Sequence, residues 1–375
     1  MDIQTGAPGF IIPKKDNRVR FVTDYRKLNA FVKRKPWPIP HIMDILQDIG
    51  PYKYVTALDL SMGYYHCKLS EATSELTTFM LDIGCYKYLR MPMGLNVSSD
   101  EFQKMMTQLF VDLSFVHAFI DDVIITSNGT YEDHINKVSQ VLDRLATKNL
   151  QVNVLKSFWA VDTVEYLGFI LTPEGIRPQP KKVEKMMAIE TPKNRRQLRH
   201  FIGMVNFYRY MWKRQSHLLE PLSRLTSTKG PFKWTQEQQD AFEELKKTIA
   251  SETMLFFPDY TKPFDLYTDA SDVQLGAVLM QENRPIAFFS RKLTSYQRNY
   301  GVGQKEMLCI VEALKEFWTM LLGYPVKVHT DHLNLTYDKL SSNSQIMRWR
   351  LMIEEFLPSL EYVEGNKNVV ADALS

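Results

Sequence analysis

The stretch Phe119-Ile120-Asp121-Asp122-Val123-Ile124-Ile125 sets two adjacent carboxylates inside an otherwise apolar run. Strand-forming residues on both sides predict a hairpin with the two aspartates at its bend. Ionised groups flanked by buried Ile and Val cost several kcal/mol each unless a cation or a hydrogen-bond donor offsets them. A divalent metal ion would supply that offset. On this stretch alone, the alternative that Asp121 and Asp122 cap an exposed turn stays open.

A third carboxylate lies upstream, near the end of the short β-rich run Val55-Thr56-Ala57-Leu58-Asp59-Leu60. One aspartate in a strand is weak evidence for a site. Asp59 together with a hairpin-borne pair is what a two-metal phosphoryl-transfer site needs, because two ions about 4 Å apart are held by carboxylates from different strands. One ion would lower the pKa of a primer 3′-hydroxyl, and the other would neutralise the triphosphate and the leaving pyrophosphate.

Six blocks of the sequence occur in a characteristic order. They are Pro13 to Asp16 with Arg20 to Asn29, Leu58 to Leu60 with Gly63-Tyr64, Met91 to Leu95 with Phe102-Gln103, Phe119 to Asp122, Leu150 to Phe158, and Tyr166 to Phe169. Together these blocks resemble the reverse transcriptase of gypsy-class long-terminal-repeat retrotransposons. The resemblance implies a right-hand polymerase whose palm carries Asp59, Asp121 and Asp122, with Asp59 and Asp121 as the main metal ligands.

The resemblance also implies a residue that selects the sugar of the incoming nucleotide. Tyr64, five residues after Asp59, matches the aromatic residue that closes against C2′ and excludes a 2′-hydroxyl. The alternative for Tyr64 is core packing beside Gly63. Met93 departs from the aromatic residue that is usual in the family at one wall of this pocket.

Three basic residues match positions that hold the phosphates of the nucleotide in the family. Lys14 and Arg20 match residues of the fingers that bind the triphosphate, and Lys15 could replace Lys14. Lys156 matches a lysine proposed to protonate the leaving pyrophosphate. For Lys156 the alternative is a solvated surface, which is the usual place of an isolated lysine.

A second set of acids begins beyond residue 258. Phe264 to Asp269 alternates apolar and polar residues like a half-buried strand. The elements expected after it are strands 276–280 and 285–289, a helix 304–322 with Glu306 in its first turn, a strand 326–331, a helix through Trp349, a strand 359–363 and the run 369–374. This is the element order of the ribonuclease H fold.

The four acids Asp269, Glu306, Asp331 and Asp372 resemble the metal-binding tetrad of ribonuclease H. Each acid alone is more often a solvated side chain. In this element order, the resemblance implies cleavage of the RNA strand of a hybrid by two metal ions. No histidine lies between His332 and Asp372, so we assign no general acid or base histidine.

The segment between the two sets of acids, residues 172–258, is interpreted as thumb and connection. Asn194 is expected to cap a helix with apolar positions Leu198, Phe201, Val205, Tyr208 and Trp212, and with a basic stripe that includes Arg195, Arg199, Arg209 and Lys213. Residues 177–214 hold eleven Lys and Arg against two acids, and residues 14–35 hold nine against two. With a formal net charge of only +3 for the whole chain, these concentrations favour phosphate-binding surfaces over solvated faces.

Composition indicates a folded chain with several domains. Its 375 residues are 45% hydrophobic and 12% aromatic, which suffices for two or three cores. Charges in every window exclude a transmembrane span or signal peptide. Cys67, Cys85 and Cys309 lack metal-ligand spacing and fit a reducing compartment.

The family resemblance runs from about residue 8 to residue 374, and the sequence stops at Ser375, three residues after Asp372. We therefore expect that the first strands of the fingers and the last helix of the nuclease are missing or unrecognisable. The turn that bears Asp372 should then fray. A stretch of a polyprotein, a predicted open reading frame and a degenerating element all fit these ends.

We accordingly predict an α/β (α+β) multidomain chain, with fingers and palm in residues 1–171, thumb and connection in 172–258, and a mixed-sheet ribonuclease H-like domain in 259–375.

The predicted function is RNA-directed and DNA-directed DNA synthesis with ribonuclease H activity. The cofactors would be two Mg²⁺ ions per site, which Mn²⁺ could replace. The partners would be RNA template, DNA primer, RNA–DNA hybrid and deoxynucleoside triphosphates. We expect a cytoplasmic location within virus-like particles, or a nuclear one with the DNA product. The alternatives are a nucleic-acid-binding remnant without activity and an enzyme with nuclease activity only.

Overall fold

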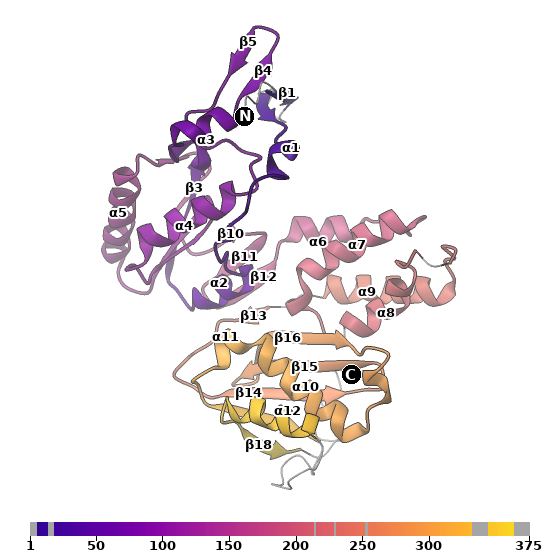
Figure 1. Cartoon of the computed structure of the whole chain (residues 1–375). Coiled ribbons are helices and arrows are strands. Elements are labelled where there is room, and N and C mark those ends of the chain that lie inside the picture. The colour runs from indigo at the N-terminus through magenta and orange to yellow at the C-terminus, as the bar shows by residue number, and fades with distance from the viewer. Residues whose placement is uncertain are drawn as a thin grey trace. The chain divides into compact units, whose positions relative to one another are not determined.

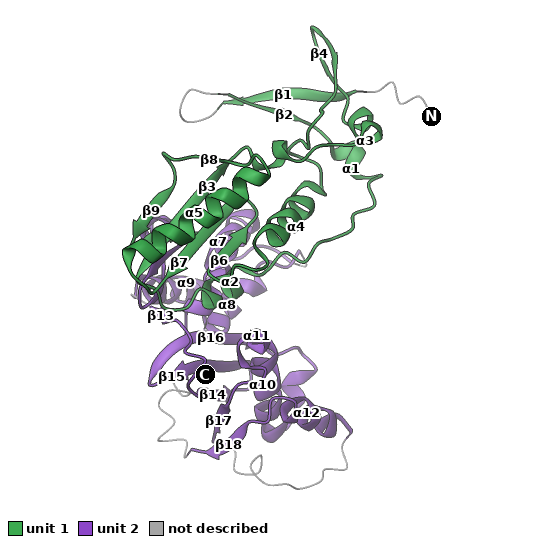
Figure 2. Ribbon diagram, turned by 90° about the vertical axis from the view of Figure 1, so that its left-hand side faces the viewer, with its two compact units in different colours: residues 1–167 green, residues 168–375 purple. Residues whose placement is uncertain are grey.

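The computed structural model describes residues 6–13, 19–213, 215–228, 230–251, 254–331 and 344–363 (Figure 1). The chain divides into two compact units, Met1–Leu167 and Gly168–Ser375 (Figure 2). The thumb and connection expected in residues 172–258 thus belong to the same unit as the nuclease-like part. The mixed α/β class expected from the sequence is confirmed.

Unit 1 is built around a five-stranded sheet in which β3 (Tyr54–Ser61) is central. The strand order is β6-β7-β3-β8, and β9 also pairs with β3. The other bounds are β6 Val116–Phe119, β7 Asp122–Ser127, β8 Gln151–Val152 and β9 Phe158–Val161, while β10 (Val164–Tyr166), near the end of the unit, is not part of this sheet. The sheet is covered by α4 (Ser98–Phe110) and α5 (Tyr131–Thr147), whose apolar faces share one core with β3 and β7. This core fixes the strands that carry the first set of acids.

Unit 1 also contains a second, smaller sheet, whose strands come from before and after β3 in the chain. Its order is β2-β1-β4-β5, with β1 antiparallel to β2 and parallel to β4. The bounds are β1 Ala7–Pro13, β2 Val19–Thr23, β4 Phe79–Leu81 and β5 Gly84–Tyr86, and the helices of this region are α1 Arg26–Asn29, α2 Ile42–Asp48, η1 Gly63–His66 and α3 Glu71–Leu76.

Unit 2 begins with a small sheet and a group of helices. The strands β11 (Phe169–Thr172), β12 (Gly175–Pro178) and β13 (Leu255–Phe256) pair antiparallel in that order. The helices are α6 Pro180–Met187, α7 Arg195–Phe207, η2 Arg209–Met211, α8 Gln215–Arg224 and α9 Gln236–Ala250. The side chain of Asn194 accepts a hydrogen bond from the Gln197 N–H, which confirms the expected cap of α7.

The expected length of the helix that starts at Arg195 is wrong. The helix ends at Phe207, so Arg209 and Lys213 are not on the same continuous helical stripe as Arg195 and Arg199. The physical reason is the packing of Tyr208, which is buried and donates from its hydroxyl to the Gly168 carbonyl at 2.6 Å. A bulky ring anchored in this way turns the chain into the short helix η2.

The second half of unit 2 is a five-stranded mixed sheet of order β16-β15-β14-β17-β18. Its strands are β14 Phe264–Ala270, β15 Gln274–Gln281, β16 Arg284–Lys292, β17 Val326–Thr330 and β18 Ser359–Tyr362, and its helices are η3 Gln297–Asn299, α10 Val302–Glu316, α11 Trp318–Leu321 and α12 Ser344–Glu354. The hairpins are antiparallel, whereas β14, β17 and β18 are parallel. This is the element order expected from the sequence, with α10 and α12 packed on the sheet through one apolar core.

Helix α10 starts two residues earlier than expected, at Val302. Glu306 is therefore its fifth residue and lies just beyond the first turn. Glu306 lies on the buried face of this helix and is 3% exposed.

Within the described part of the chain, no helix is both long and apolar enough to cross a bilayer.

Candidate active sites

The first candidate site lies where β3 and β7 run side by side. Asp59, near the end of β3, is the register partner of Asp122, the first residue of β7. The Leu60 N–H donates to the Asp121 carbonyl at 3.1 Å, which ties the hairpin to β3. Three carboxylates from two chain segments are thus brought together, as the sequence predicted.

The hairpin itself is tighter than a bend made by both aspartates. Phe119 pairs with Asp122, so Ile120 and Asp121 alone form the turn between β6 and β7. Ile120 has a φ of +55°, a left-handed conformation that a β-branched residue rarely adopts. Asp122 belongs to the strand, and its position is therefore fixed by the β7–β3 ladder.

The electrostatics of this group are those of crowded carboxylates. Partial removal from water, together with the charges of Asp121 and Asp59, raises the pKa of Asp122 to about 6. Lys156 is the nearby cation, with its Nζ 3.7 Å from an Asp59 carboxylate oxygen. Ser157 also supports Asp59, because its Oγ accepts from the Asp59 N–H at 3.1 Å. Ser157 is not among the site residues predicted from the sequence, where its signal is its place beside Lys156.

The residues expected to bind the nucleotide are placed as follows. Tyr64 lies in η1, where its hydroxyl is 3.2 Å from Ser99 Oγ and its ring meets the edge of Phe102. Gly63 must be small here, since a Cβ would come within 2.7 Å of the Phe102 ring. Arg20 is exposed on β2, and Lys14 lies outside the described residues.

The second candidate site forms at the ends of β14 and β17, against α10. Asp269 is close to the end of β14, Asp331 directly follows β17, and Glu306 approaches from α10. One carboxylate oxygen of Glu306 accepts from the Ala270 N–H at 3.1 Å. The other, Oε2, is buried and has no hydrogen-bond partner among the residues that the structure describes. The expected fourth acid, Asp372, lies outside the described residues.

Glu306 is the most perturbed carboxyl group of this second site. Burial, followed by the charges of Asp269 and Asp331, raises the pKa of Glu306 to about 8, although the Ala270 N–H opposes the shift. One turn further along α10, the buried Cys309 thiol lies 3.3 Å from the Asp269 carbonyl and 3.2 Å from the Gly276 carbonyl. Cys309 is therefore a free, buried thiol packed beside Asp269 and Glu306.

The described residues contain no ready-made cage of three or more His, Cys, Asp or Glu side chains around a metal position. The fit of a cation must then be judged from the acids themselves. A buried carboxylate oxygen without a described partner, as in Glu306, and a carboxyl pKa raised by neighbouring charges, as in Asp122 and Glu306, are conditions that a bound cation relieves. On this test both sets of acids fit a hard divalent cation, for which carboxylates are preferred ligands.

The basic residues expected to contact nucleic acid lie on the surface of unit 2, and several already have partners. Arg195 donates to the carbonyls of Ser227 and Gly230, and Arg199 donates to that of Thr226. Arg209 pairs with Glu316 at 2.7 Å. Lys213 is exposed and lies 5.9 Å from the centre of the Phe288 ring.

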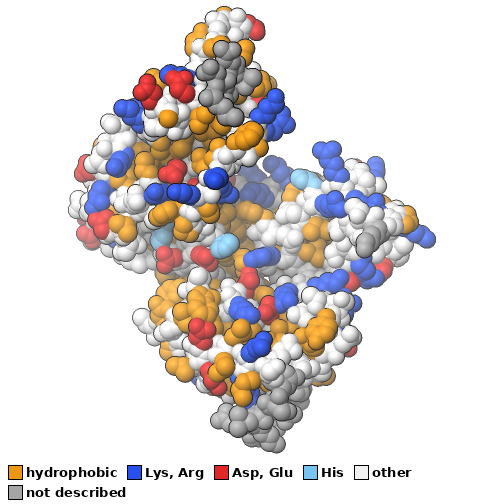
Figure 3. Space-filling view, in the orientation of Figure 1, with side chains coloured by type: hydrophobic (Ala, Val, Ile, Leu, Met, Phe, Trp, Pro, Cys, Tyr) orange, Lys and Arg blue, Asp and Glu red, His pale blue; other side chains and the backbone are white. Residues whose placement is uncertain are grey.

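Two adjoining hollows of about 500 and 450 Å³ run along α6 and α7. They share Lys185, His200 and Met204 and so form one groove. Lys182, Lys193 and Arg199 line its edges, and Figure 3 shows Lys and Arg side chains gathered over these helices. The groove therefore combines a partly apolar floor with a cationic rim.

Two family models match the chain. Residues 12–171 match the model described as "Reverse transcriptase (RNA-dependent DNA polymerase)", and residues 234–328 match "RNase H-like domain found in reverse transcriptase".

Three curated relatives illustrate the similarity. The Retrovirus-related Pol polyproteins from transposons opus and gypsy of Drosophila melanogaster are 36% and 34% identical over 98% of this chain. The Transposon Tf2-3 polyprotein of Schizosaccharomyces pombe is 33% identical over the same share. The chain spans 39%, 38% and 29% of the lengths of these relatives, respectively.

Solved structures confirm the fold. The foamy viral protease-reverse transcriptase in complex with dsDNA matches with a TM-score of 0.86 and 23% identity, over 96% of this chain and 78% of that one. The same viral protein in complex with an RNA/DNA hybrid matches with a TM-score of 0.82 and 23% identity, over 96% and 50% of the two chains.

Proposed function

Because this chain belongs to the reverse transcriptase and ribonuclease H region of the Pol polyproteins of gypsy-class long-terminal-repeat retrotransposons, we propose that it synthesises DNA on RNA and DNA templates and cleaves the RNA strand of a hybrid. The observation that carries this proposal is the pairing of Asp59 with Asp122 beside the Ile120–Asp121 turn. Carboxylates that converge from two strands are suited to phosphoryl transfer. The substrates would be a primed template and deoxynucleoside triphosphates.

The cofactor of both reactions would be Mg²⁺, with two ions at each centre. Asp59, Asp121 and Asp122 would hold the ions of the polymerase. Asp269, Glu306, Asp331 and Asp372 would hold those of the nuclease. When bound, such ions lower the pKa of the attacking hydroxyl or water and neutralise charge on the phosphate. The raised pKa values of Asp122 and Glu306 support this assignment, since a carboxylate that resists ionisation alone gains most from a cation.

Side chains around the first centre would orient the nucleotide. Lys156, whose ammonium lies 3.7 Å from Asp59, would donate a proton to the leaving pyrophosphate. Tyr64 would exclude a ribose 2′-hydroxyl by steric clash, with its ring held by Phe102 and Ser99. Arg20 and Lys14 would hold the triphosphate.

The groove along α6 and α7 would bind the backbone of the template–primer duplex. The lysine and arginine side chains that line it suit phosphates. The groove lies along α6 and α7, which follow the polymerase region in the sequence. Arg195, Arg199, Arg209 and Lys213 would extend this surface. The guanidinium N–H groups of Arg195 and Arg199 that donate to backbone carbonyls would fix the orientation of the two side chains. Their remaining N–H groups would bind phosphate.

Two substitutions test the assignment of the two activities. Asp121→Asn should abolish primer extension and leave hybrid cleavage near the parental rate, whereas Glu306→Gln should do the reverse. The assays are extension of a labelled primer on an RNA template and cleavage of a labelled RNA–DNA hybrid, both with Mg²⁺. Asp143→Asn, which changes an exposed carboxylate of α5, is the matched control and should leave both rates unchanged.

The parental chain decides between the proposal and its alternatives in the same assays. Hybrid cleavage without extension would identify a nuclease only. Loss of both activities with retained binding to nucleic acid would identify an inactive remnant. Extension that survives Asp121→Asn would refute the assignment of the palm carboxylates.

A further inference from the structure

The turn that carries Asp121 is held in a conformation that its own sequence does not favour. Ile120 has a φ of +55°, and a β-branched side chain in this region is a true conformational outlier. A residue in such a conformation carries a cost in free energy, and the conformation persists only where surrounding contacts enforce it. The groups that bind the backbone on both sides of Ile120 therefore determine where the Asp121 carboxylate lies.

Gln103, on helix α4, binds the backbone on the β6 side of this turn, at Ala118 and at Ile120. Its Oε1 accepts from the Ile120 N–H at 2.6 Å, and its Nε2 donates to the Ala118 carbonyl at 3.0 Å. The side chain is 2% exposed, so water does not compete for these bonds. The amide of Gln103 supplies both the acceptor and the donor that these two backbone groups require.

Helix α4 is itself firmly anchored, so that Gln103 can impose its position on the turn. Asp100, one turn before Gln103, is 1% exposed and is bound bidentately by Arg34 at 2.6 and 2.9 Å. Phe102 and Met106 on the same helix are fully buried in the core of unit 1. Gln103 thus projects from a rigid element toward a strained one.

We propose that Gln103 is a positioning residue for DNA synthesis, which holds the Ile120–Asp121 turn in its left-handed conformation and thereby aims the Asp121 carboxylate at the reacting centre. The inference rests on the proposed function of unit 1. It assigns Gln103 no contact with nucleotide or primer. A displacement of about 1 Å in such a carboxylate can cost about a hundredfold in rate.

The test combines the loss of Gln103 with relief of the strain. Gln103→Leu, which keeps the volume but removes both hydrogen bonds, should lower the single-turnover rate of primer extension by about ten- to a hundredfold, with little change in the apparent affinity for the nucleotide. Ile120→Gly in the Gln103→Leu background should recover about tenfold, because glycine adopts a positive φ without strain. Gln103→Glu keeps an acceptor for the Ile120 N–H, so its single-turnover rate of primer extension should fall less than that of Gln103→Leu.

Controls separate this role from general damage to the fold. Thr107→Val removes the more distant partner of the Gln103 amide, at 3.4 Å, and should extend primers at the parental rate. Hybrid cleavage, which depends on unit 2, should be equal in all variants. Exchange of the Ile120 amide hydrogen, followed by mass spectrometry on a peptide spanning the turn, should accelerate in Gln103→Leu and measures the hydrogen bond without any activity.

The outcomes are distinct. A Gln103→Leu variant within twofold of the parental rate, or one that Ile120→Gly does not improve, overturns the inference. So does an unchanged exchange rate at Ile120. A parental chain that fails to extend primers refutes the proposed function, and faster Ile120 exchange in Gln103→Leu would then still support the part of the inference that concerns the turn.

Discussion

At the scale of single residues, the environment of each side chain sets the role it can take. Asp122 and Glu306 are partly or largely buried and lie among other carboxylates, so the pKa of each is raised. Tyr64 is different, because its ring and hydroxyl are fixed by Phe102 and Ser99 rather than by charge. A fixed ring can act only by its shape.

Tyr64→Val should therefore raise the incorporation of ribonucleotides relative to deoxyribonucleotides. Deleting the ring removes a steric clash with the 2′-hydroxyl and supplies no new contact, so the gain should be about tenfold or more in the ratio of kcat/KM values. Single-nucleotide extension with matched ribo- and deoxyribonucleotides measures this ratio.

Tyr64→Phe is the control, since it keeps the ring and loses only the hydroxyl bonded to Ser99. Its ratio should stay at the parental value. An unchanged ratio in Tyr64→Val would assign Tyr64 to the core, the alternative that its place beside Gly63 first suggested.

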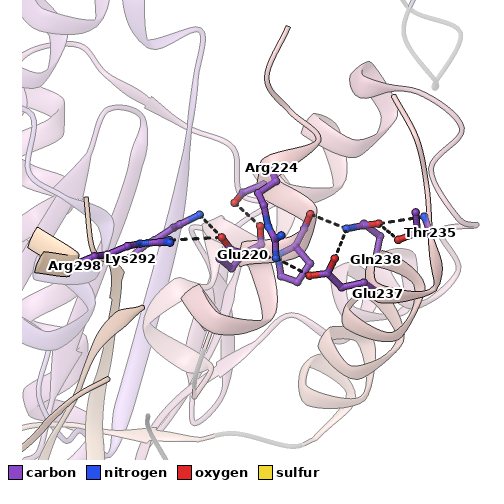
Figure 4. A network of polar contacts seen from close by, with 9 residues as sticks. Glu220, Arg224, Thr235, Glu237, Gln238, Lys292 and Arg298 are labelled. Atoms are coloured by element: carbon purple, nitrogen blue, oxygen red, sulfur yellow. Dashed lines mark hydrogen bonds and ion pairs between the residues drawn. The ribbon is translucent and has the colours of Figure 1, made fainter. Parts of the chain in front are cut away.

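At the scale of elements, two contacts join helices to sheets through buried polar groups. In unit 1, His134 of α5 is fully buried and its two ring nitrogens lie 2.8 Å from Thr56 Oγ1 of β3 and from Ser127 Oγ of β7. In unit 2, Glu220 of α8 binds Lys292 of β16 at 2.7 Å and Arg224 at 2.6 Å, and Arg224 also binds Glu237 of α9 at 2.6 Å (Figure 4). Both contacts titrate, so both predict a dependence of stability on pH.

For His134, stability should fall as the pH drops below about 6.5, the pKa of histidine in an unfolded chain. Burial, with a smaller effect of Lys137, lowers the pKa of His134 in the folded protein. Below about 6.5 the unfolded chain therefore binds a proton that the folded chain refuses, and the free energy of unfolding decreases. Urea unfolding of the parental chain and of His134→Asn at pH 5, 6 and 7 measures the effect.

The variant should be less stable at pH 7, by about 1–3 kcal/mol for the lost buried hydrogen bonds, and less sensitive to pH. His200→Asn changes an exposed histidine of α7 and is the control. A parental pH dependence in His134→Asn would show that protonation of His134 does not contribute.

For Glu220, stability should also be lost toward acid, but at lower pH. Burial opposes ionisation, yet the hydrogen bonds from Lys292 and Arg224 outweigh it and lower the pKa of Glu220. The stabilisation is complete above the unfolded pKa of about 4.3 and disappears as the pH falls through the lower, folded value.

Glu220→Ala should cost about 1–3 kcal/mol at pH 7, because Lys292 and Arg224 lose a partner that is only 12% exposed. Glu244→Ala breaks an exposed i,i+3 pair with Lys247 and should cost less than about 0.5 kcal/mol. Equal losses in the two variants, measured by thermal unfolding, would contradict a special role for the Glu220 network.

At the scale of the whole molecule, positive charge is concentrated in particular segments although the net charge of the chain is small. The formal net charge is only +3, yet residues 177–214 alone carry eleven Lys and Arg against two acids. The described part of this segment forms the helices α6 and α7 with their cationic groove. Such a local field attracts phosphate without making the chain uniformly basic.

Changing Arg195 and Arg199 together to Ala should therefore weaken binding of a primer–template duplex equally for all sequences. Each lost phosphate contact should reduce the slope of log K against log salt by about 0.9 for B-form DNA. Fluorescence anisotropy at several salt concentrations measures the slope.

The same pair changed to Lys keeps both charges and is the matched control, because the two arginines also hold the backbone at Thr226, Ser227 and Gly230. Lys variants with the parental slope and Ala variants with a smaller one support phosphate contact. A loss that depends on sequence, or equal losses in both variants, would contradict it.

The sequence by itself determined the order of the elements and the types of residue at both candidate sites. Alternation and apolar periodicity act over a few residues, which is why the strand with Asp269, the hairpin with Asp121 and the cap at Asn194 were all predictable. Boundaries were less predictable: the helix from Arg195 ends at Phe207, where the anchoring of Tyr208 overrides the local pattern.

Only the tertiary structure decided which distant groups meet. The bonds from Gln103 to the Ile120 turn, the register of Asp59 with Asp122 and the unpartnered oxygen of Glu306 depend on packing between segments that are far apart in the chain. Lys14 and Asp372 lie outside the described residues, so their places in the two sites stay predictions. The physical reason for this division is that periodicity in the sequence specifies which face of an element is buried. Hydrogen bonds and pKa shifts depend instead on the groups of the neighbouring element that packs against that face.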